Sequence, residues 1–360
     1  MYVIRGVRAS HALLLVGLLY AGCGGGEAEP EPISPDELRA IAADLVFASE
    51  RDGVRRPLRL RPGAPEAQGI GEAVGVDEVP LAVAPDGGAV VVGRTVEAGG
   101  AKLEQLVVWE GGRATPLTPP TQRARNPSWS PDGTWLAFEA DLASASDLWR
   151  VERGGAGLVR LTDNPEGNYE PTVAPDGESI VFVSSRDMNA EAYRMRADGT
   201  EPVRLPGSPR DEWAPRPSPD GTRLALLTGE RGRDEIVLTR ADGVDRQRPG
   251  STRAGGPASG DVLEADPAWS PDGTRLAYAT VARTGARQVW VAEIDTGAHR
   301  ALTDTTSWAP AWSPDGRYLA FVSDRDGSPS LYLVRADGSG TVRLTDASGA
   351  ETPPLWAARR

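Results

Sequence analysis

Short, nearly continuous runs of apolar residues recur along most of the chain. The clearest examples are WLAFEA (135–140), SIVFVS (179–184), RLALLT (223–228), RLAYAT (275–280) and YLAFVS (318–323). Runs of this length are typical of strands, since a helix usually needs about ten residues or more. Successive side chains of a strand point to opposite faces, so both faces of these strands must be covered. The pattern therefore predicts buried strands that pack between neighbouring sheets.

Each apolar run follows a Pro-Asp-Gly turn. The turn aspartates are Asp86, Asp132, Asp176, Asp220, Asp272 and Asp315, and the motif returns every 43 to 52 residues. Proline at the second position and glycine at the fourth position of Ser-Pro-Asp-Gly favour a type I turn. Pro-x-Trp-Ser segments before the turns, as at 127–130 and 310–313, predict a short inner strand. SLYLVR (330–335) and VRLTD (342–346) predict a third and a fourth strand after the apolar run.

Four antiparallel strands in every repeat predict an all-β fold, the β-propeller. A period of 43 to 52 residues is in the range of propeller blades. The content of 42 glycines and 31 prolines agrees with many tight turns between short strands. Arg160, Arg204 and Arg343 lie in predicted fourth strands, where charged side chains protect an exposed sheet edge.

The repeat unit P-x-W-S-P-D-G-x-x-[LI]-A-[FY], followed by D-R-D-G and A-D-G turns, resembles the TolB-type, WD40-like Pro-Asp repeat. The resemblance covers about residues 45–358. It implies a β-propeller and a protein or peptide partner in the bacterial cell envelope. The resemblance does not decide the activity, because this repeat also forms the non-catalytic domain of some peptidases.

The two ends of the chain each hold part of one repeat. DLVFASERDGVRRPLRL (44–60) resembles YLAFVSDRDGSPSLYLV (318–334) but lacks a preceding inner strand. PPLW (353–356) is an inner strand without the rest of its repeat, and Trp356 follows Trp312 by one period. We therefore predict seven four-stranded blades, closed by pairing of the N- and C-terminal strands, which leaves no open sheet edge. The alternative is six blades with the two ends as caps.

Residues 1–22 have the features of a secretory signal. Arg5 and Arg8 precede a short apolar run at 12–20, which is too short to span a bilayer. The only cysteine, Cys23, follows in LLYAGC, which resembles a bacterial lipoprotein signal. We therefore expect Cys23 to be lipidated and to anchor the protein in the cell envelope, outside the cytoplasm. The lipid is the only membrane contact that we expect.

Residues 23–44 are predicted to form a flexible tether with a possible short helix. The glycines and prolines at its start favour flexibility and extension. Ser34 and Glu37 have the spacing of a capping box, and Pro35 suits the first helical position. The propeller is expected over the remaining residues, 45–358.

Side chains that would support catalysis or metal binding are scarce. After residue 22 the chain has one histidine, His299, which is predicted to lie on the surface in a fourth strand. The Gly-x-Ser-x-Gly elbow of hydrolases does not occur, and the cysteine and histidine counts exclude a zinc site of usual composition. The turn aspartates lack the spacing of a calcium loop and are expected to bond their own backbone. We therefore predict no cofactor and no metal.

The function predicted from these features is non-catalytic binding of a protein or peptide. A formal net charge of −12 argues against a nucleic-acid partner, since phosphate contacts need basic side chains. The alternative is a propeller enzyme, such as a polysaccharide lyase or a hydrolase. Such an enzyme would need clustered His, Arg or Lys side chains in the channel.

A candidate binding face follows from the register of the repeat. The residues seven positions before the turn aspartates are Arg125, Tyr169, Trp213, Ala265 and Trp308. In a propeller this register lies on the face that carries the connections from the second to the third strand. Tyr169, Trp213 and Trp308 are therefore expected to converge at the mouth of the channel, where aromatic anchors are typical of protein-binding hot spots. The alternative is that the rings only cover the ends of the blades.

Polar residues and one insertion belong to the same predicted face. Asn126 belongs to this face, and the carboxylates near the aromatic register are Glu78, Glu170, Glu212, Glu264, Asp266 and Glu351. The long interval between Asp220 and Asp272 adds residues 248–263 to this face, most simply as a tolerated surface loop.

Overall fold

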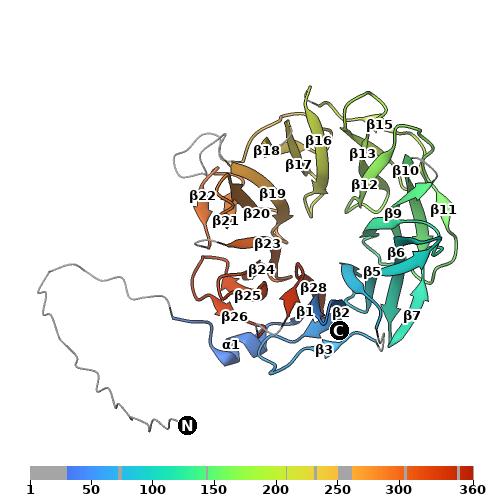
Figure 1. Ribbon diagram of the computed structural model, residues 1–360. Coiled ribbons are helices and arrows are strands. Elements are labelled where there is room, and N and C mark those ends of the chain that lie inside the picture. Colours follow the sequence, from blue (N-terminus) through green and yellow to red (C-terminus); the bar gives the residue numbers. More distant parts are fainter. Residues whose placement is uncertain are drawn as a thin grey trace, which may run out of the picture. The chain divides into compact units, whose positions relative to one another are not determined.

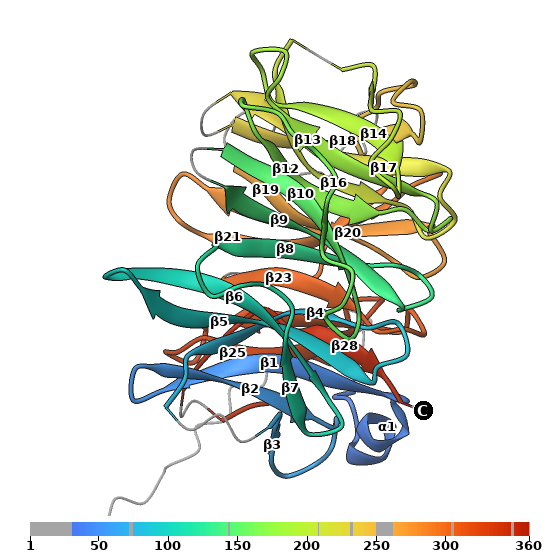
Figure 2. The ribbon, with the colours of Figure 1, turned by 90° about the vertical axis from the view of Figure 1, so that its right-hand side faces the viewer.

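The computed structural model describes residues 31–71, 75–142, 145–207, 209–230, 233–249, 262–303, 306–346 and 349–359. Seven antiparallel sheets follow one another around a common axis (Figure 1). The side view in Figure 2 shows the sheets stacked face against face. This arrangement confirms the predicted seven-bladed β-propeller.

Five blades are continuous in the chain and have four strands each. They are β4 (Glu78–Val83), β5 (Ala89–Ala98), β6 (Ala101–Glu110) and β7 (Arg113–Pro116); β8 (Ala124–Trp129), β9 (Trp135–Leu142), β10 (Ala145–Glu152) and β11 (Val159–Arg160); β12 (Asn168–Val173), β13 (Ser179–Ser184), β14 (Glu191–Arg196) and β15 (Val203–Arg204); β19 (Val262–Trp269), β20 (Arg275–Ala282), β21 (Arg287–Glu293) and β22 (His299–Ala301); and β23 (Ser307–Trp312), β24 (Tyr318–Ser323), β25 (Ser330–Arg335) and β26 (Val342–Arg343).

One blade departs from the predicted four strands. It contains β16 (Asp211–Pro217), β17 (Arg223–Glu230) and β18 (Arg233–Arg240) as its only sheet strands among the described residues. Its fourth strand is reduced to a single antiparallel bridge between Leu238 and Gln247.

The apolar runs form the second strand of each blade, as predicted. Every residue of β13 and of β24 is buried, which agrees with strands covered on both faces. The core consists of clusters that join adjacent blades. In one cluster, Ala277 and Val291 pack with Leu319 and Phe321 of the next blade. Packing between blades therefore holds the ring together.

The Ser-Pro-Asp-Gly segments form the predicted tight turns. In the turn at 130–133, the Gly133 N–H donates to the Ser130 carbonyl at 2.9 Å. The Asp132 carboxylate accepts the Thr134 N–H at 3.0 Å. The corresponding carboxylates of Asp86, Asp176, Asp220, Asp272 and Asp315 also accept backbone N–H groups two residues further on. The prediction that these aspartates bond their own backbone is thus confirmed.

The two ends of the chain complete one blade together, as predicted. β1 (Ala43–Arg51), β2 (Val54–Leu60) and β3 (Gln68–Gly69) supply the outer strands, and β27 (Ala350–Glu351) and β28 (Leu355–Ala358) supply the inner one. Leu45 pairs with Trp356, and Ser49 pairs with Glu351. The Trp356 indole N–H also donates to the Ala311 carbonyl of the neighbouring blade at 3.0 Å. The six-blade alternative is therefore excluded.

A short helix, α1 (Pro35–Ala40), precedes the first strand. The Ser34 hydroxyl accepts the Glu37 N–H at 3.1 Å, which caps the helix as the sequence predicts. Leu38 lies on the buried face of the helix, in the apolar cluster between the last blade and the closing blade. In both ribbon views α1 lies beside the closing blade (Figures 1 and 2).

Glu37 ties the helix to the last blade. Its carboxylate accepts hydrogen bonds from Arg335 Nε at 2.8 Å and from the Tyr318 hydroxyl at 2.9 Å. The Arg335 guanidinium, more than the Tyr318 hydroxyl, lowers the pKa of Glu37 to about 2. Residues 34–40 are thus part of the folded unit.

Two sequence predictions concern residues outside the described ranges. Cys23 and the predicted signal at 1–22 lie outside them, as do residues 250–261 of the long insertion. Among the described residues, no helix is long and apolar enough to cross a membrane.

Candidate functional site: the channel mouth

The inner strands share an irregularity near their start. In five blades the register shifts just before the proline, and the residue preceding that proline has a positive φ. These residues, which we call the mouth positions, are Asn126 (52°), Glu170 (51°), Ala214 (49°), Asp266 (53°) and Ala309 (51°). Residues other than glycine rarely adopt this conformation, and residues before proline usually stay extended. The repeated bulge turns each mouth position out of the strand ladder.

Carboxylates at the mouth positions link one blade to the next. Glu170 accepts the Ala214 N–H at 2.5 Å, and Asp266 accepts the Ala309 N–H. Glu139, in the second strand β9, links the blade of Asn126 to the blade of Glu170. It accepts the Glu170 N–H at 3.0 Å and the Asn126 side-chain amide at 2.9 Å. These bonds satisfy the backbone groups that the bulges free.

A cavity of about 320 Å³ opens into the channel beside these positions. Its wall comes from the inner strands of four successive blades and includes Leu81, Asn126, Ser128, Glu170, Thr172 and Arg216. Asn126, Asp266 and Arg216 are exposed, whereas Glu170 is half-buried. Desolvation by the surrounding protein atoms raises the pKa of the Asp266 carboxyl, although the residue is exposed. Asn126 and Glu170 of the predicted face thus line the same cavity.

The three aromatic residues of the predicted face occupy one register but lie in separate blades. Tyr169, Trp213 and Trp308 are each half-buried. Trp213 packs on the apolar cluster that contains Tyr278, and Trp308 packs on the cluster between the last blade and the closing blade. The Arg287 guanidinium lies 4.6 Å from the Trp308 ring centre. Trp213 and Trp308 therefore cover gaps between blades and keep one part open to solvent, whereas the Tyr169 hydroxyl donates to the Glu166 carbonyl at 3.2 Å.

Glu212 does not belong to the exposed face. Its side chain is completely buried, forms an ion pair with Arg246 at 2.5 Å and accepts the Ala192 N–H at 3.3 Å. A buried carboxylate needs such partners, so Glu212 serves the fold. The predicted face is therefore formed without it.

The local sequence explains why a glutamate is buried at this point. In other blades a threonine just after the fourth strand accepts the N–H at the same place of the third strand, as Thr162 does for Leu148 at 2.9 Å. The corresponding threonines are Thr118, Thr303 and Thr345. In two blades that lack a threonine at this place, a glutamate of the following blade accepts the third-strand N–H instead. Glu212 accepts the Ala192 N–H, and Glu264 accepts the Ile236 N–H. The missing threonine is the sequence signal that could have predicted this role.

The remaining titratable candidate, His299, lies in the fourth strand β22, where the sequence placed it. The ring is half-buried, and its Nδ1 is 2.7 Å from the Tyr278 hydroxyl. Burial lowers the pKa of His299. Within the part of the chain that the structure describes, no three His, Cys, Asp or Glu side chains group as metal ligands.

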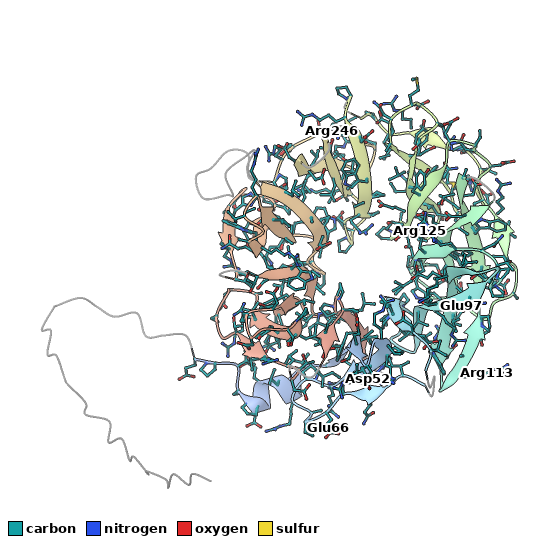
Figure 3. The ribbon with its side chains drawn as sticks, viewed as in Figure 1. Asp52, Glu66, Glu97, Arg113, Arg125 and Arg246 are labelled. Atoms are coloured by element: carbon teal, nitrogen blue, oxygen red, sulfur yellow. The ribbon has the colours of Figure 1, made fainter. Side chains whose placement is uncertain are left out.

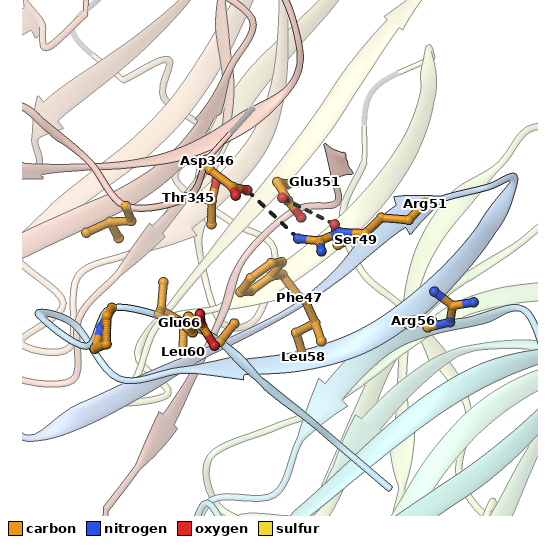
Figure 4. Close-up of a pocket in the computed structure, with 13 residues that line it drawn as sticks. Phe47, Ser49, Arg51, Arg56, Leu58, Leu60, Glu66, Thr345, Asp346 and Glu351 are labelled. Atoms are coloured by element: carbon orange, nitrogen blue, oxygen red, sulfur yellow. Dashed lines mark hydrogen bonds and ion pairs between the residues drawn. The ribbon is translucent and has the colours of Figure 1, made fainter. Parts of the chain in front are cut away.

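A second hollow of about 400 Å³ lies where the two ends of the chain meet (Figure 4). Phe47 and Leu58 form part of its apolar floor, and Arg51 and Asp346 face each other at 3.8 Å across its rim. Glu351 faces this hollow with only 6% of its side chain exposed. Its Oε1 accepts the Ser49 hydroxyl at 3.3 Å, and its Oε2 has no hydrogen-bond partner among the described residues. Burial raises the pKa of Glu351 to about 7.

Seven antiparallel blades around a common axis define the protein as a β-propeller. The model of the TolB beta propeller domain matches residues 110–255 and 258–359, and the chain belongs to this family. A 60-residue segment is 33% identical to the uncharacterized protein Atu1656 of Agrobacterium fabrum. That match spans 17% of this chain and 20% of the relative.

Solved structures share the fold at low sequence identity. TolB from Acinetobacter baumannii is 17% identical with a TM-score of 0.54, over 88% of this chain and 67% of that one. The oligogalacturonate lyase of Vibrio parahaemolyticus is 13% identical with a TM-score of 0.62, over 84% and 88%. A puromycin-hydrolyzing peptidase of Mycobacterium tuberculosis is 17% identical with a TM-score of 0.63, over 89% and 56%. Since the same fold occurs in TolB and in two enzymes, the fold alone does not decide between binding and catalysis.

Proposed function

We propose that this protein is a non-catalytic propeller that binds a protein or peptide of the bacterial cell envelope at the channel mouth. The observation that carries the proposal is the repeated register of the inner strands. It sets a half-exposed aromatic ring directly before three of the mouth positions, and the carboxylates of Glu170 and Asp266 accept the backbone N–H groups of the residues that follow Trp213 and Trp308. Large rings that are only partly covered, next to charged groups, are suited to anchor a partner. Membership of the TolB beta propeller family supports an envelope partner.

Capture from envelope extracts tests this proposal. Immobilised wild-type protein is expected to retain a specific partner, and the double variant Trp213→Ala/Trp308→Ala is expected to lose it, because both anchoring rings are gone. Loss of binding should accompany a folded β-sheet spectrum of the variant. Equal capture by a folded double variant would show that the aromatic register is not the binding face.

We further propose that residues 1–22 are a signal peptide, that residues 23–44 connect the anchor to the propeller, and that Cys23 carries the lipid. The proposal rests on the lone cysteine in LLYAGC after a short apolar run. Cys23→Ser is expected to move the protein from the membrane fraction to the soluble fraction of the envelope, because no acyl chains remain to hold it. Fractionation with immunodetection measures this change. Unchanged membrane association of the serine variant would contradict the lipid anchor.

A further inference from the structure

One arginine interrupts an otherwise uncharged layer of the channel wall. In six blades, the inner-strand residue four positions before the turn aspartate pairs with the equivalent residue of the second strand. This residue is Ala82, Ser128, Thr172, Ala268 or Ala311 in five blades, and Leu355 takes the matching place in the closing blade. The remaining blade has Arg216. A single guanidinium therefore lies in a layer of otherwise uncharged side chains.

The Arg216 guanidinium leaves most of its donors unused. Within the part of the chain that the structure describes, it donates only through Nη1, at 3.4 Å to the Thr172 hydroxyl and at 3.0 Å to the Pro215 carbonyl. Among the described residues, no carboxylate lies within ion-pair distance of Arg216, whereas Arg246 of the same blade pairs with Glu212. The Nε and Nη2 groups form the edge that can bind a carboxylate with two parallel hydrogen bonds.

The surroundings of Arg216 favour an anion of low charge. Protein atoms around the channel lower the pKa of Arg216 by desolvation, while Glu170 and Asp266 act in the opposite direction. Guanidinium stays protonated in such surroundings, so the cation persists. Glu170 and Asp266 are each bound to the backbone of the following blade, so neither closes onto the guanidinium. Their charges would repel a phosphate dianion more than a monovalent carboxylate.

We propose that Arg216 binds a carboxylate in the channel cavity. This proposal deepens the proposed function and rests on it, since the carboxylate would belong to the bound protein or peptide, as its C-terminus or as an acidic side chain. The cavity of about 320 Å³ beside Arg216 gives room for a few residues of such a segment. Leu81, Pro127 and Pro171 give its wall an apolar part for the neighbouring aliphatic groups. Carboxylate and guanidinium would then compensate each other at the bottom of the mouth.

Titration calorimetry of the purified full-length protein with three short peptides tests the proposal. The peptides are acetyl-trialanine with a free C-terminus, the same peptide as its amide, and acetyl-Ala-Glu-Ala-amide. We expect the amidated trialanine to bind at least about tenfold more weakly than a carboxylate peptide, because a charge-assisted hydrogen bond is lost. Tight binding of the first peptide identifies a C-terminus as the ligand group, and tight binding of the third identifies an acidic side chain.

Two substitutions assign the effect to the guanidinium. Arg216→Gln is expected to weaken binding of the carboxylate peptide at least about tenfold, to the level of the amide. Arg216→Lys is expected to be intermediate, because the charge remains but the two-pronged geometry is lost. The control is Arg113→Gln, the same change at an exposed position of β7 on the outer rim (Figure 3), which should bind as the wild type does. Melting temperatures show whether each variant is folded.

Several outcomes would overturn the proposal. They are equal binding of the amide and the acid, unchanged binding by folded Arg216→Gln, and no binding of any peptide at millimolar concentration. These outcomes can be separated from failure of the proposed function. If envelope capture depends on Trp213 and Trp308 while the peptides fail to bind, only the carboxylate site is wrong.

Discussion

Removal of residues 350–360 is expected to unfold the propeller at physiological temperature. The removed segment contains β27 and β28, which are the inner strand of the closing blade and pair directly with β1. Ala357 is completely buried in a cluster with Val46, and Trp356 packs on the cluster that also holds Phe47. Loss of a whole strand with these contacts should exceed the usual net stability of about 5–15 kcal/mol or consume most of it. Thermal unfolding followed by circular dichroism measures the effect.

Substitutions at Trp356 test the same closure more gently. The indole is half-buried and donates to the Ala311 carbonyl, so Trp356→Ala is expected to cost about 3 kcal/mol. Trp356→Phe keeps most of the ring and loses only the hydrogen bond, with an expected cost of about 1 kcal/mol. A truncated protein that melts at the wild-type temperature would contradict closure of the ring by both ends of the chain.

Replacing Glu351 by glutamine is expected to stabilise the protein by about 2–3 kcal/mol at pH 8 and to change its stability little at pH 5. Burial raises the pKa of this carboxyl from its ordinary value of 4.5 to about 7. Between these two values the folded protein holds a proton that the unfolded chain has lost. Wild-type stability therefore falls as the pH rises from 4.5 through 7 and then levels off. Glutamine cannot ionise, so the variant lacks this decrease.

Denaturant unfolding of both proteins between pH 5 and pH 8 measures the difference. Glu66→Gln is the matched control, because Glu66 lies exposed at the rim of the same hollow (Figure 4). This variant should follow the wild-type pH profile. A Glu351→Gln profile parallel to that of the wild type would mean that the carboxyl ionises in the folded protein as it does in the unfolded chain.

The sequence was sufficient to predict the fold because each repeat contains a recognisable pattern for every strand and for the tight turn. Six Pro-Asp-Gly turns set the period, and the partial repeats at the two ends predicted the closing blade, with Trp356 in the inner strand. The reduced fourth strand at Gln247 was not predicted. The fourth strands of the other blades have only two to four residues, and a single bridge leaves no pattern of apolar residues to detect.

The candidate site was predicted only in part, because spacing fixes a position along a strand but not the direction of its side chain. Asn126 and Glu170, which share the predicted face, line one cavity in the structure. The register could not show that the Glu212 side chain is buried and pairs with Arg246. This burial follows from the absence of a threonine in the preceding blade, where Glu212 accepts the Ala192 N–H in its place. The positive φ before each proline was also unexpected, since such residues usually remain extended. Nothing in the sequence singled out Arg216, because only the structure shows that it is the one charged residue of its layer and lines the cavity.

Binding at the mouth is tested most directly by the affinity of the captured partner for single variants. Trp213→Ala and Trp308→Ala are each expected to weaken binding by at least about 2 kcal/mol, roughly thirtyfold in Kd, because hot-spot rings are lost. Trp290→Ala is the control, since Trp290 packs on the same cluster as Trp213 but lies in the third strand β21. It should lower the melting temperature to a similar extent and leave Kd unchanged. If folded Trp213→Ala and Trp308→Ala bind the partner with wild-type Kd, the channel mouth is not the binding surface.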